Sequence, residues 1–393
     1  MDVSDLRIAL FSGNYNYTRD GANQALNRLV GSLLGRGAKV RVYSPKVANP
    51  DFPATGDLVG LPNIPMPVKG RGEYRMPTHL GAAVKRDLEG FAPDIVHLSS
   101  PDPAAHAALR WARAHDMPVL ASVHTRFETY PRYYNMAFLE PLIIKGLKRF
   151  YNRCDALVAP SQSMIDELRA MGMHTRIGLW SRGVDRTIFS SARRDPEWRR
   201  SLGLTDDDVA IVFLGRLVME KGLDVFAETI RRLREQGAGH KVLVIGDGPA
   251  RGWFEANLPD GAIFAGFKTG EGLGQALASG DVFFNPSVTE TFGNVTLEAM
   301  ASGLPVVAAG ATGSASLVAD GVTGQLVAPT GNLKTDAAAF AAALAPYCAD
   351  PALRAAHGAA GETRACEYSW EAINAVVADT YVDLVRERRG GRA

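Results

Sequence analysis

Short runs of aliphatic and β-branched residues alternate along the chain with longer segments of helical periodicity. Because these runs are mostly apolar at successive positions, they predict strands that are buried on both faces of a parallel sheet. Helical patterns such as 23–34 and 104–114 lie between them, so the order of elements indicates repeated βαβ units. In the first half, the predicted strands cover residues 7–11, 39–43, 94–98, 118–123 and 156–159.

The same alternation begins again after a polar stretch at 190–208. Predicted helices of this second half include 223–236, 270–278 and 295–302. The pattern therefore predicts two doubly wound, Rossmann-like α/β domains, at residues 1–190 and 191–369. The strands of the second domain are predicted at residues 210–214, 241–245, 262–264, 282–285, 305–309 and 325–327.

The last segment, 370–393, predicts one long amphipathic helix. Ser369 is a suitable N-cap residue for it. A helix with an apolar stripe must bury that stripe against another element. The stripe consists of Trp370, Ile373, Val376, Val377, Tyr381 and Leu384.

Composition excludes several classes of protein. Lys and Arg number 43 and Asp and Glu number 42, so no overall positive field would hold the chain on nucleic acid. The three cysteines form no CxxC pair, which argues against a disulfide scaffold or a zinc module and fits a reducing cytoplasm. A signal peptide and a long apolar run are both missing from the sequence given, so we expect a cytoplasmic protein, either free or attached to the inner face of the membrane.

The segment 285–307 is the strongest candidate for chemistry. A predicted strand ends at Asn285, a turn carries Glu290, and a helix begins at Asn294 with Glu298 about one turn later. The N-terminus of a helix suits a phosphate or a sugar hydroxyl, and carboxylates accept hydrogen bonds from hydroxyls. The residues alone also allow a purely structural interpretation, which is a surface helix with two solvated glutamates.

Three further candidates lie where predicted strands end. Arg216 and Lys221 follow the first strand of the second domain, at the edge where open α/β sheets bind ligands. Two cations there would suit a diphosphate, although a solvated lysine is an ordinary alternative. His124 directly follows the strand at 118–123, but a lone histidine is more often structural.

Two weaker patterns point elsewhere. The run Asp206–Asp208 contains a D-x-D pattern typical of metal-dependent transferases, but it precedes a strand and predicts a polar turn. The Gly246–Gly248 turn lacks the third glycine of the dinucleotide-binding pattern, so a nicotinamide dehydrogenase is disfavoured.

The segment 289–307 reads TETFGNVTLEAMASGLPVV, and its two glutamates resemble the E-x7-E signature of the retaining glycosyltransferases of family 4. Two other segments agree in order: GRLVMEKG at 215–222 resembles the diphosphate-binding motif of that family, and GDGP at 246–249 resembles its G-x-G-P turn. The resemblance implies the GT-B fold, with two Rossmann-like domains facing a cleft. It also implies that the C-terminal helix crosses back to the first domain.

The resemblance also implies roles for individual residues. Glu290 would bind sugar hydroxyls, Arg216 and Lys221 would bind the diphosphate without a metal, and His124 would face the sugar. Near Gly21 the family has a glycine-rich loop, but this chain has Asp20-Gly21 in place of the common Gly-Gly, so an ordinary βα turn is nearly as good an interpretation. The residues implied in donor binding, with Glu298 on the ribose and Phe267 near the base, are Gly21, Gly215, Gly246, Phe267, Phe292, Gly293, Asn294, Val295 and Glu298.

The implied reaction is transfer of a hexosyl group to a hydroxyl with retention, which gives an α-linkage. No cofactor beyond a GDP- or UDP-linked donor is expected, and GDP-mannose and a UDP-hexose both stay open. Because no nucleophilic carboxylate is recognisable across the cleft, we expect front-face attack in which the leaving phosphate takes the acceptor proton.

The acceptor is suggested by residues 133–153, which mix aromatic, aliphatic and basic side chains. Such a segment could lie on an anionic bilayer, or it could be a core helix with a solvated basic face. The segments HTRFETYPRY at 124–133 and LWSRGVD at 179–185 resemble sulfoquinovosyldiacylglycerol synthases and bacterial lipid α-mannosyltransferases, which implies a lipid acceptor. A soluble saccharide or small-molecule acceptor is the alternative.

Two rival functions fit the same architecture. A two-domain sugar-binding protein would need no paired cations and would normally carry an export signal. A nucleotide-sugar epimerase of the GT-B fold would bind the donor but would need no acceptor.

Overall fold

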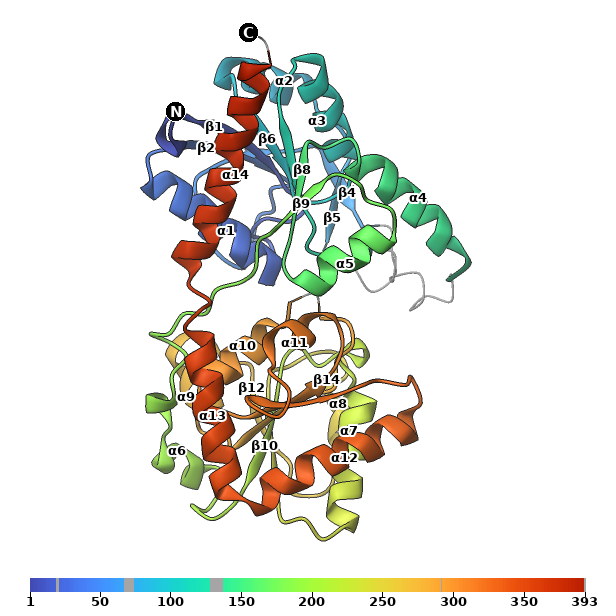
Figure 1. Cartoon of the computed structure of the whole chain (residues 1–393), viewed down its shortest axis with the longest axis vertical. Coiled ribbons are helices and arrows are strands. Elements are labelled where there is room, and N and C mark those ends of the chain that lie inside the picture. The colour runs from blue at the N-terminus through green and yellow to red at the C-terminus, as the bar shows by residue number, and fades with distance from the viewer. Residues whose placement is uncertain (19–20, 67–73, 128–136, 291, 392–393) are drawn as a thin grey trace. The chain divides into compact units, whose positions relative to one another are not determined.

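The computed structural model describes residues 1–18, 21–66, 74–127, 137–290 and 292–391 (Figure 1). The chain divides into two compact units, Met1–Ser181 with Trp370–Ala393, and Arg182–Ser369. The first boundary therefore lies at Ser181 and not at the expected position 190. The reason is local packing: Val184 and Phe189 are buried in a hydrophobic cluster of the second unit, and Val184 N donates to Tyr368 O at 3.1 Å, so residues 182–190 belong to that unit. The expected cleft between the domains stays a prediction.

A parallel sheet forms the centre of the first unit. Within the described residues it has seven strands in the order β3-β2-β1-β6-β7-β8-β9. Its central strands are buried at every position, which is why their sequences are continuously apolar. The strands are β1 (Arg7–Phe11), β2 (Lys39–Ser44), β3 (Asp57–Gly60), β6 (Ile95–Leu98), β7 (Val119–Ser122), β8 (Ala156–Ala159) and β9 (Arg176–Leu179), and a separate antiparallel pair is formed by β4 (Asn63–Pro65) and β5 (Arg75–Pro77).

Helices cover both faces of this sheet. One face packs against the apolar sides of α2 (Ala82–Phe91), α3 (Pro103–Ala114), α4 (Glu140–Tyr151) and α5 (Gln162–Ala170). Helices α1 (Gly21–Gly35) and α14 (Trp370–Gly390) contact each other (Figure 1). The hydroxyl of Tyr381 on α14 is hydrogen-bonded to His97 of the sheet. Short 3-10 turns, η1 (Val3–Asp5) and η3 (Ala137–Leu139), complete the described part of this unit.

The C-terminal helix α14 therefore belongs to the first unit, as the resemblance implied. Buried side chains on it include Val377, Tyr381 and Leu384, which follow the predicted apolar stripe. Val376 departs from the prediction because it is 46% exposed. Ion pairs from Arg388 and Arg389 to aspartates of the first unit fasten the last turns of the helix.

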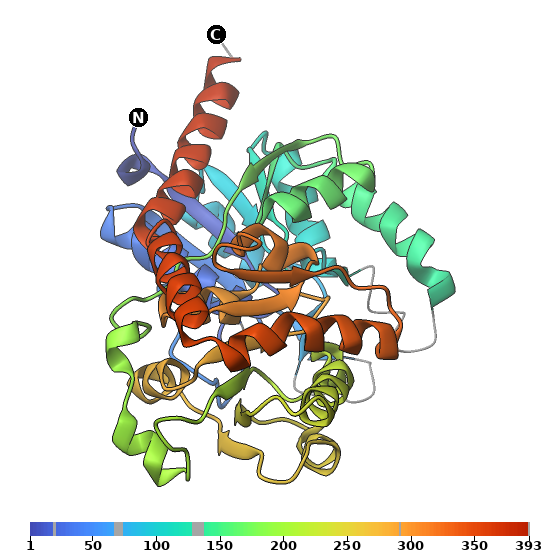
Figure 2. The same ribbon diagram turned by 60° about the horizontal axis from the view of Figure 1, so that its bottom comes forward.

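The second unit is also a doubly wound parallel sheet (Figure 2). Its described strands follow the order β12-β11-β10-β13-β14-β15, and two hydrophobic clusters fill the space between the sheet and its helices. The strands are β10 (Ala210–Leu214), β11 (Lys241–Ile245), β12 (Ile263–Gly266), β13 (Val282–Asn285), β14 (Val306–Ala309) and β15 (Gly324–Val327). The helical elements are η4 (Ser191–Arg193), α6 (Pro196–Ser201), η5 (Met219–Lys221), α7 (Leu223–Glu235), α8 (Arg251–Asn257), α9 (Gly270–Ala278), α10 (Asn294–Ala301), α11 (Thr312–Leu317), α12 (Leu333–Ala349) and α13 (Pro351–Ala365).

Candidate functional site

The three sequence motifs meet at one edge of the second sheet. The chain runs outward from β10 through β11 to β12 and then returns to place β13 on the other side of β10. This change of direction is the place where open α/β sheets bind ligands, at the carboxyl ends of the strands. The loops that follow β10, β11 and β13 carry the GRLVMEKG motif, the GDGP turn and Glu290, respectively.

Two glycines allow the first two loops to touch. A Cβ atom on Gly246 would lie 1.9 Å from the Gly215 carbonyl oxygen, and one on Gly248 would lie 2.5 Å from the Leu217 carbonyl oxygen. No side chain fits at either position. Leu217 N donates to Asp247 O at 3.0 Å and Ala250 N donates to Leu217 O at 2.9 Å, so the two loops form one rigid backbone platform.

The lysine of the first motif lies against the first glutamate of the third. Lys221 Nζ is 2.6 Å from Glu290 Oε1, and the two side chains are 29% and 15% exposed. Thr289 Oγ1 also donates to the Glu220 carbonyl at 3.1 Å, which ties the two loops together beside this ion pair. The pair places opposite charges where an anionic ligand would compete with the carboxylate for the ammonium.

Helix α10 begins beside this pair with an open N-terminus. Gly293 precedes it at φ +92°, a left-handed conformation that favours glycine, and among the described residues no side-chain hydrogen bond caps the helix. Asn294 Oδ1 is buried, and none of the described residues donates a hydrogen bond to it. The free N–H groups and the positive end of the helix dipole favour an anion or hydroxyl oxygens at this point.

The other predicted residues of the second unit differ in exposure. Arg216 is exposed, whereas Val295 and Glu298 are partly buried at the start of α10. Phe267 follows β12 and is 68% exposed. Phe292 is buried and packs edge-on against Tyr368, with ring centroids 6.0 Å apart, so only its backbone remains for the predicted ligand contact.

The two predicted residues of the first unit lie at the carboxyl edge of its sheet. Gly21 begins α1, while its neighbour Asp20 lies outside the described residues. His124 follows β7, and its ring packs edge-on against Trp180 with centroids 5.1 Å apart. Their contact with the donor stays a prediction.

The D-x-D run forms a polar turn. Asp208 Oδ2 accepts hydrogen bonds from Thr205 N and Thr205 Oγ1 at 2.7 and 2.8 Å, and Asp206 pairs loosely with Arg200. In the part of the chain that the structure describes, no group of three His, Cys, Asp or Glu side chains is placed to hold a metal ion.

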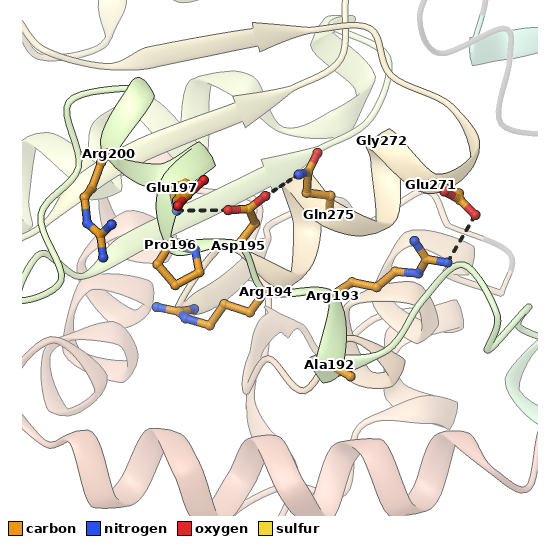
Figure 3. Close-up of a pocket in the computed structure, with 10 residues that line it drawn as sticks. All are labelled: Ala192, Arg193, Arg194, Asp195, Pro196, Glu197, Arg200, Glu271, Gly272 and Gln275. Atoms are coloured by element: carbon orange, nitrogen blue, oxygen red, sulfur yellow. Dashed lines mark hydrogen bonds and ion pairs between the residues drawn. The ribbon is translucent and has the colours of Figure 1, made fainter.

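A cavity of about 730 Å³ lies elsewhere in the second unit, between the segment 192–200 and α9 (Figure 3). Its charged side chains are largely engaged with each other or with backbone: Gln275 donates to Asp195 at 2.6 Å, and Arg193 pairs with Glu271 at 3.5 Å (Figure 3). None of the predicted site residues lines it.

Sequence reasoning missed several residues that shape the site. Asn285 donates to Thr296 Oγ1 at 3.2 Å, which is 3.4 Å from Ser314 Oγ, and this buried chain connects the end of β13 to α10 and α11. A Cβ atom on Gly313 would lie 2.4 Å from the Phe292 carbonyl carbon, so α11 approaches the loop before α10 closely. The only signal in the sequence was the small, polar character of these positions.

Comparison with known proteins places both units in described families. Residues 19–187 match the family described as Glycosyltransferase Family 4, and residues 208–350 match the family described as Glycosyl transferases group 1.

Curated relatives align along most of the chain. A protein of Mycolicibacterium smegmatis named GDP-mannose-dependent alpha-mannosyltransferase is 32% identical over 82% of this chain and 84% of its own length. A protein of the same name from Corynebacterium glutamicum is 28% identical over 98% and 90%. Sulfoquinovosyl transferase SQD2 of Arabidopsis thaliana is 32% identical over 82% of this chain and 64% of its own length.

Solved structures show the same fold. Sucrose-phosphate synthase from Thermosynechococcus elongatus superposes with a TM-score of 0.75 at 21% identity, over 96% of this chain and 99% of that one. WaaG, a glycosyltransferase involved in lipopolysaccharide biosynthesis, superposes with a TM-score of 0.69 at 18% identity, over 95% and 99%.

Proposed function

This chain belongs to glycosyltransferase family 4 and has the GT-B fold, and we propose that it transfers a hexosyl group from a GDP- or UDP-sugar to an acceptor hydroxyl with retention, forming an α-linkage. The observation that carries the proposal is the Lys221–Glu290 pair beside the uncapped N-terminus of α10. Such a site offers cations to a diphosphate and a carboxylate to sugar hydroxyls.

Donor binding would rearrange this pair. The diphosphate would take Lys221, assisted by Arg216, and Glu290 would then be available to accept hydrogen bonds from the sugar. Glu298, about one turn into α10, would accept from the ribose, and His124 would face the sugar. These roles follow the motif resemblance and the position of each residue at the edge of its sheet.

The reaction would proceed on one face of the sugar. The bond between the anomeric carbon and the phosphate oxygen breaks, and a bond from the same carbon to the acceptor oxygen forms on that face. The acceptor proton moves to the departing phosphate. Lys221, Arg216 and the α10 N-terminus would stabilise the negative charge that develops on the leaving group.

The donor and the reaction can be tested together with a panel of nucleotide sugars. GDP-mannose is the first to test because the relatives from Mycolicibacterium smegmatis and Corynebacterium glutamicum carry it in their names, and UDP-hexoses follow. We expect nucleotide release that increases when a lipid or saccharide acceptor is added, with an α-linked product by NMR. Conversion of the donor sugar without any acceptor would instead indicate an epimerase.

We expect activity to persist in EDTA, because two cations and a helix N-terminus replace the metal at the diphosphate. The measurement is the initial rate after chelation and after addition of magnesium or manganese. Asp206→Asn, in the exposed polar turn, serves as a control that should leave the rate unchanged. A rate lost on chelation and restored by a divalent ion would contradict metal independence and implicate the turn.

A membrane glycolipid is the proposed acceptor, and an exposed face of the α4 region supports it. Phe138 and Leu142 are 76% and 66% exposed, although both are large and apolar. Leu142, Lys145 and Arg149 follow helical spacing and are all exposed, so they share one outer face of α4. Leu147 and Phe150 are buried on the opposite side. Residues 133–136 of the predicted membrane segment lie outside the described residues.

The exposed basic residues of this face and of the chain around it should bind anionic vesicles in a salt-dependent manner. Lys145, Lys148, Arg149 and Arg153 would each contribute about 1 kcal/mol near the surface, together approximately 4 kcal/mol or near a thousandfold in partitioning. High salt should weaken binding because the Debye length is only about 8 Å at physiological ionic strength. Vesicle sedimentation with and without anionic lipid measures this.

Two variants separate the contributions to vesicle binding. Changing the four basic residues to glutamine should remove the dependence on anionic lipid, and Phe138→Ser with Leu142→Ser should weaken binding at any salt concentration. Changing Lys334 to glutamine, an exposed lysine of the second unit, is the matched control. If the wild-type protein ignores anionic vesicles throughout, the acceptor is a soluble molecule and the donor assignment is unaffected. Among the described helices, none is long and apolar enough to cross a membrane.

A further inference from the structure

Beneath His124, the first unit contains a buried chain of polar contacts. Successive side chains of a strand point to opposite faces of the sheet. His97 of β6 pairs with Leu120 of β7, two positions before Ser122, so His97 and Ser122 point to the same face. His97 Nε2 lies 2.9 Å from Ser122 Oγ, and its Nδ1 is hydrogen-bonded to the Tyr381 hydroxyl of α14. His97 is fully buried, and burial lowers its pKa to about 3, so the ring is a neutral bridge between the sheet and the C-terminal helix.

Trp180 connects this chain to His124. It follows β9, is 1% exposed, and its backbone N–H donates to Ala159 O at 2.8 Å. The indole meets the His124 ring at 5.1 Å and 66°, and it meets the His97 ring at 6.2 Å and 64°. Edge-to-face geometry of this kind constrains the rotation of both imidazoles.

The C-terminal helix α14 provides a hydrogen-bond acceptor for Trp180. Trp180 Nε1 donates to Asn374 Oδ1 at 3.4 Å, and Asn374 Nδ2 donates to the Arg28 carbonyl of α1 at 3.4 Å. Asn374 is 3% exposed, and a buried amide on a helix otherwise lined with apolar residues needs such partners. Trp180 and Asn374 are 194 positions apart in the sequence, and they meet beside the ring of His124 that Trp180 contacts.

We propose that Trp180 is a positioning residue for His124 and that α14 sets its position through Asn374 and Tyr381. The orientation of the His124 imidazole then depends on the docking of the C-terminal helix. The inference rests on the proposed function only in assigning His124 to the donor sugar; the mechanical connection stands apart from it.

The connection is tested first by NMR, without substrate. In histidine-labelled protein, the ring proton resonances of His124 are assigned by their loss in His124→Gln. We expect Asn374→Leu to shift them, because loss of the amide acceptor lets the Trp180 indole move relative to the imidazole that it packs against. Val376→Ala, at an exposed position on the same helix, is the matched control and should leave them unchanged.

Kinetics provides the second measurement. We expect Asn374→Leu and Trp180→Phe to lower kcat about tenfold with the donor KM within about twofold, since a misplaced imidazole loses an interaction made in the transition state. Asn374→Gln, which retains the amide acceptor, should recover part of the loss. Tyr381→Phe provides a further variant that keeps the buried ring if Asn374→Leu does not fold.

The outcomes separate the two proposals. Unshifted His124 resonances in folded Asn374→Leu and Trp180→Phe proteins would overturn the positioning role and leave the transferase assignment untouched. Shifted resonances with unchanged kcat would keep the connection but remove His124 from the reaction. A tenfold rise in the donor KM without loss of kcat would also contradict the proposal that Trp180 positions His124 for the transition state.

Discussion

Lys221→Ala should lower the rate of transfer by roughly 30- to 1000-fold while the protein stays folded, because removing a charged contact at a developing negative charge costs about 2–4 kcal/mol. The ammonium lies 2.6 Å from Glu290 at the carboxyl edge of the second sheet, where the diphosphate would leave. Glu298→Ala should have a similar effect because it removes the proposed ribose contact on α10. The measurement is kcat and KM with the donor identified from the nucleotide-sugar panel.

The control is Lys334→Ala, which changes an exposed lysine near the start of α12 in the same unit. It should leave both constants unchanged. Circular dichroism and thermal melting establish that each variant is folded. Near wild-type turnover in folded Lys221→Ala or Glu298→Ala would contradict the assignment of the donor site. It would leave the assignment of the fold unchanged.

Deletion from Trp370 onward should abolish stable folding of the first unit. Helix α14 buries Ile373, Val377, Tyr381, Leu384 and Val385 in that unit. Each large apolar side chain contributes about 1.5–3 kcal/mol when buried, so their joint loss is comparable with the whole stability of a domain, about 5–15 kcal/mol. Deletion would also remove the Tyr381 partner of His97 and the Asn374 partner of Trp180 from a buried region.

The measurement is the yield of soluble protein and the cooperativity of its thermal unfolding. Removal of only residues 391–393 is the control, and it should leave the melting temperature unchanged because the buried stripe ends earlier. A truncation at 369 that melts cooperatively and transfers sugar at the full rate would show that α14 is dispensable to the fold.

The central strands were predictable because strands buried on both faces have apolar residues at successive positions. The strands β1, β8, β10, β11 and β13 have the predicted bounds. The outer strands β3 and β9 were missed because they are half exposed, and their mixed sequences, DLVG and RIGL, resemble loops. Their place in the sheet is decided by pairing with β2 and β8, which only the folded chain shows.

The βαβ order, the apolar stripe of α14 and the residue types of the three motifs were predictable without the structure, because each depends on local spacing. The tertiary structure decided which of those residues meet. Lys221 and Glu290 are 69 positions apart, and Trp180 and Asn374 are 194 apart, so no local pattern could pair them. It also decided that the chain after Ser181 belongs to the second unit and that Phe292 turns into the core, because contacts with distant side chains, and not the local sequence, set both.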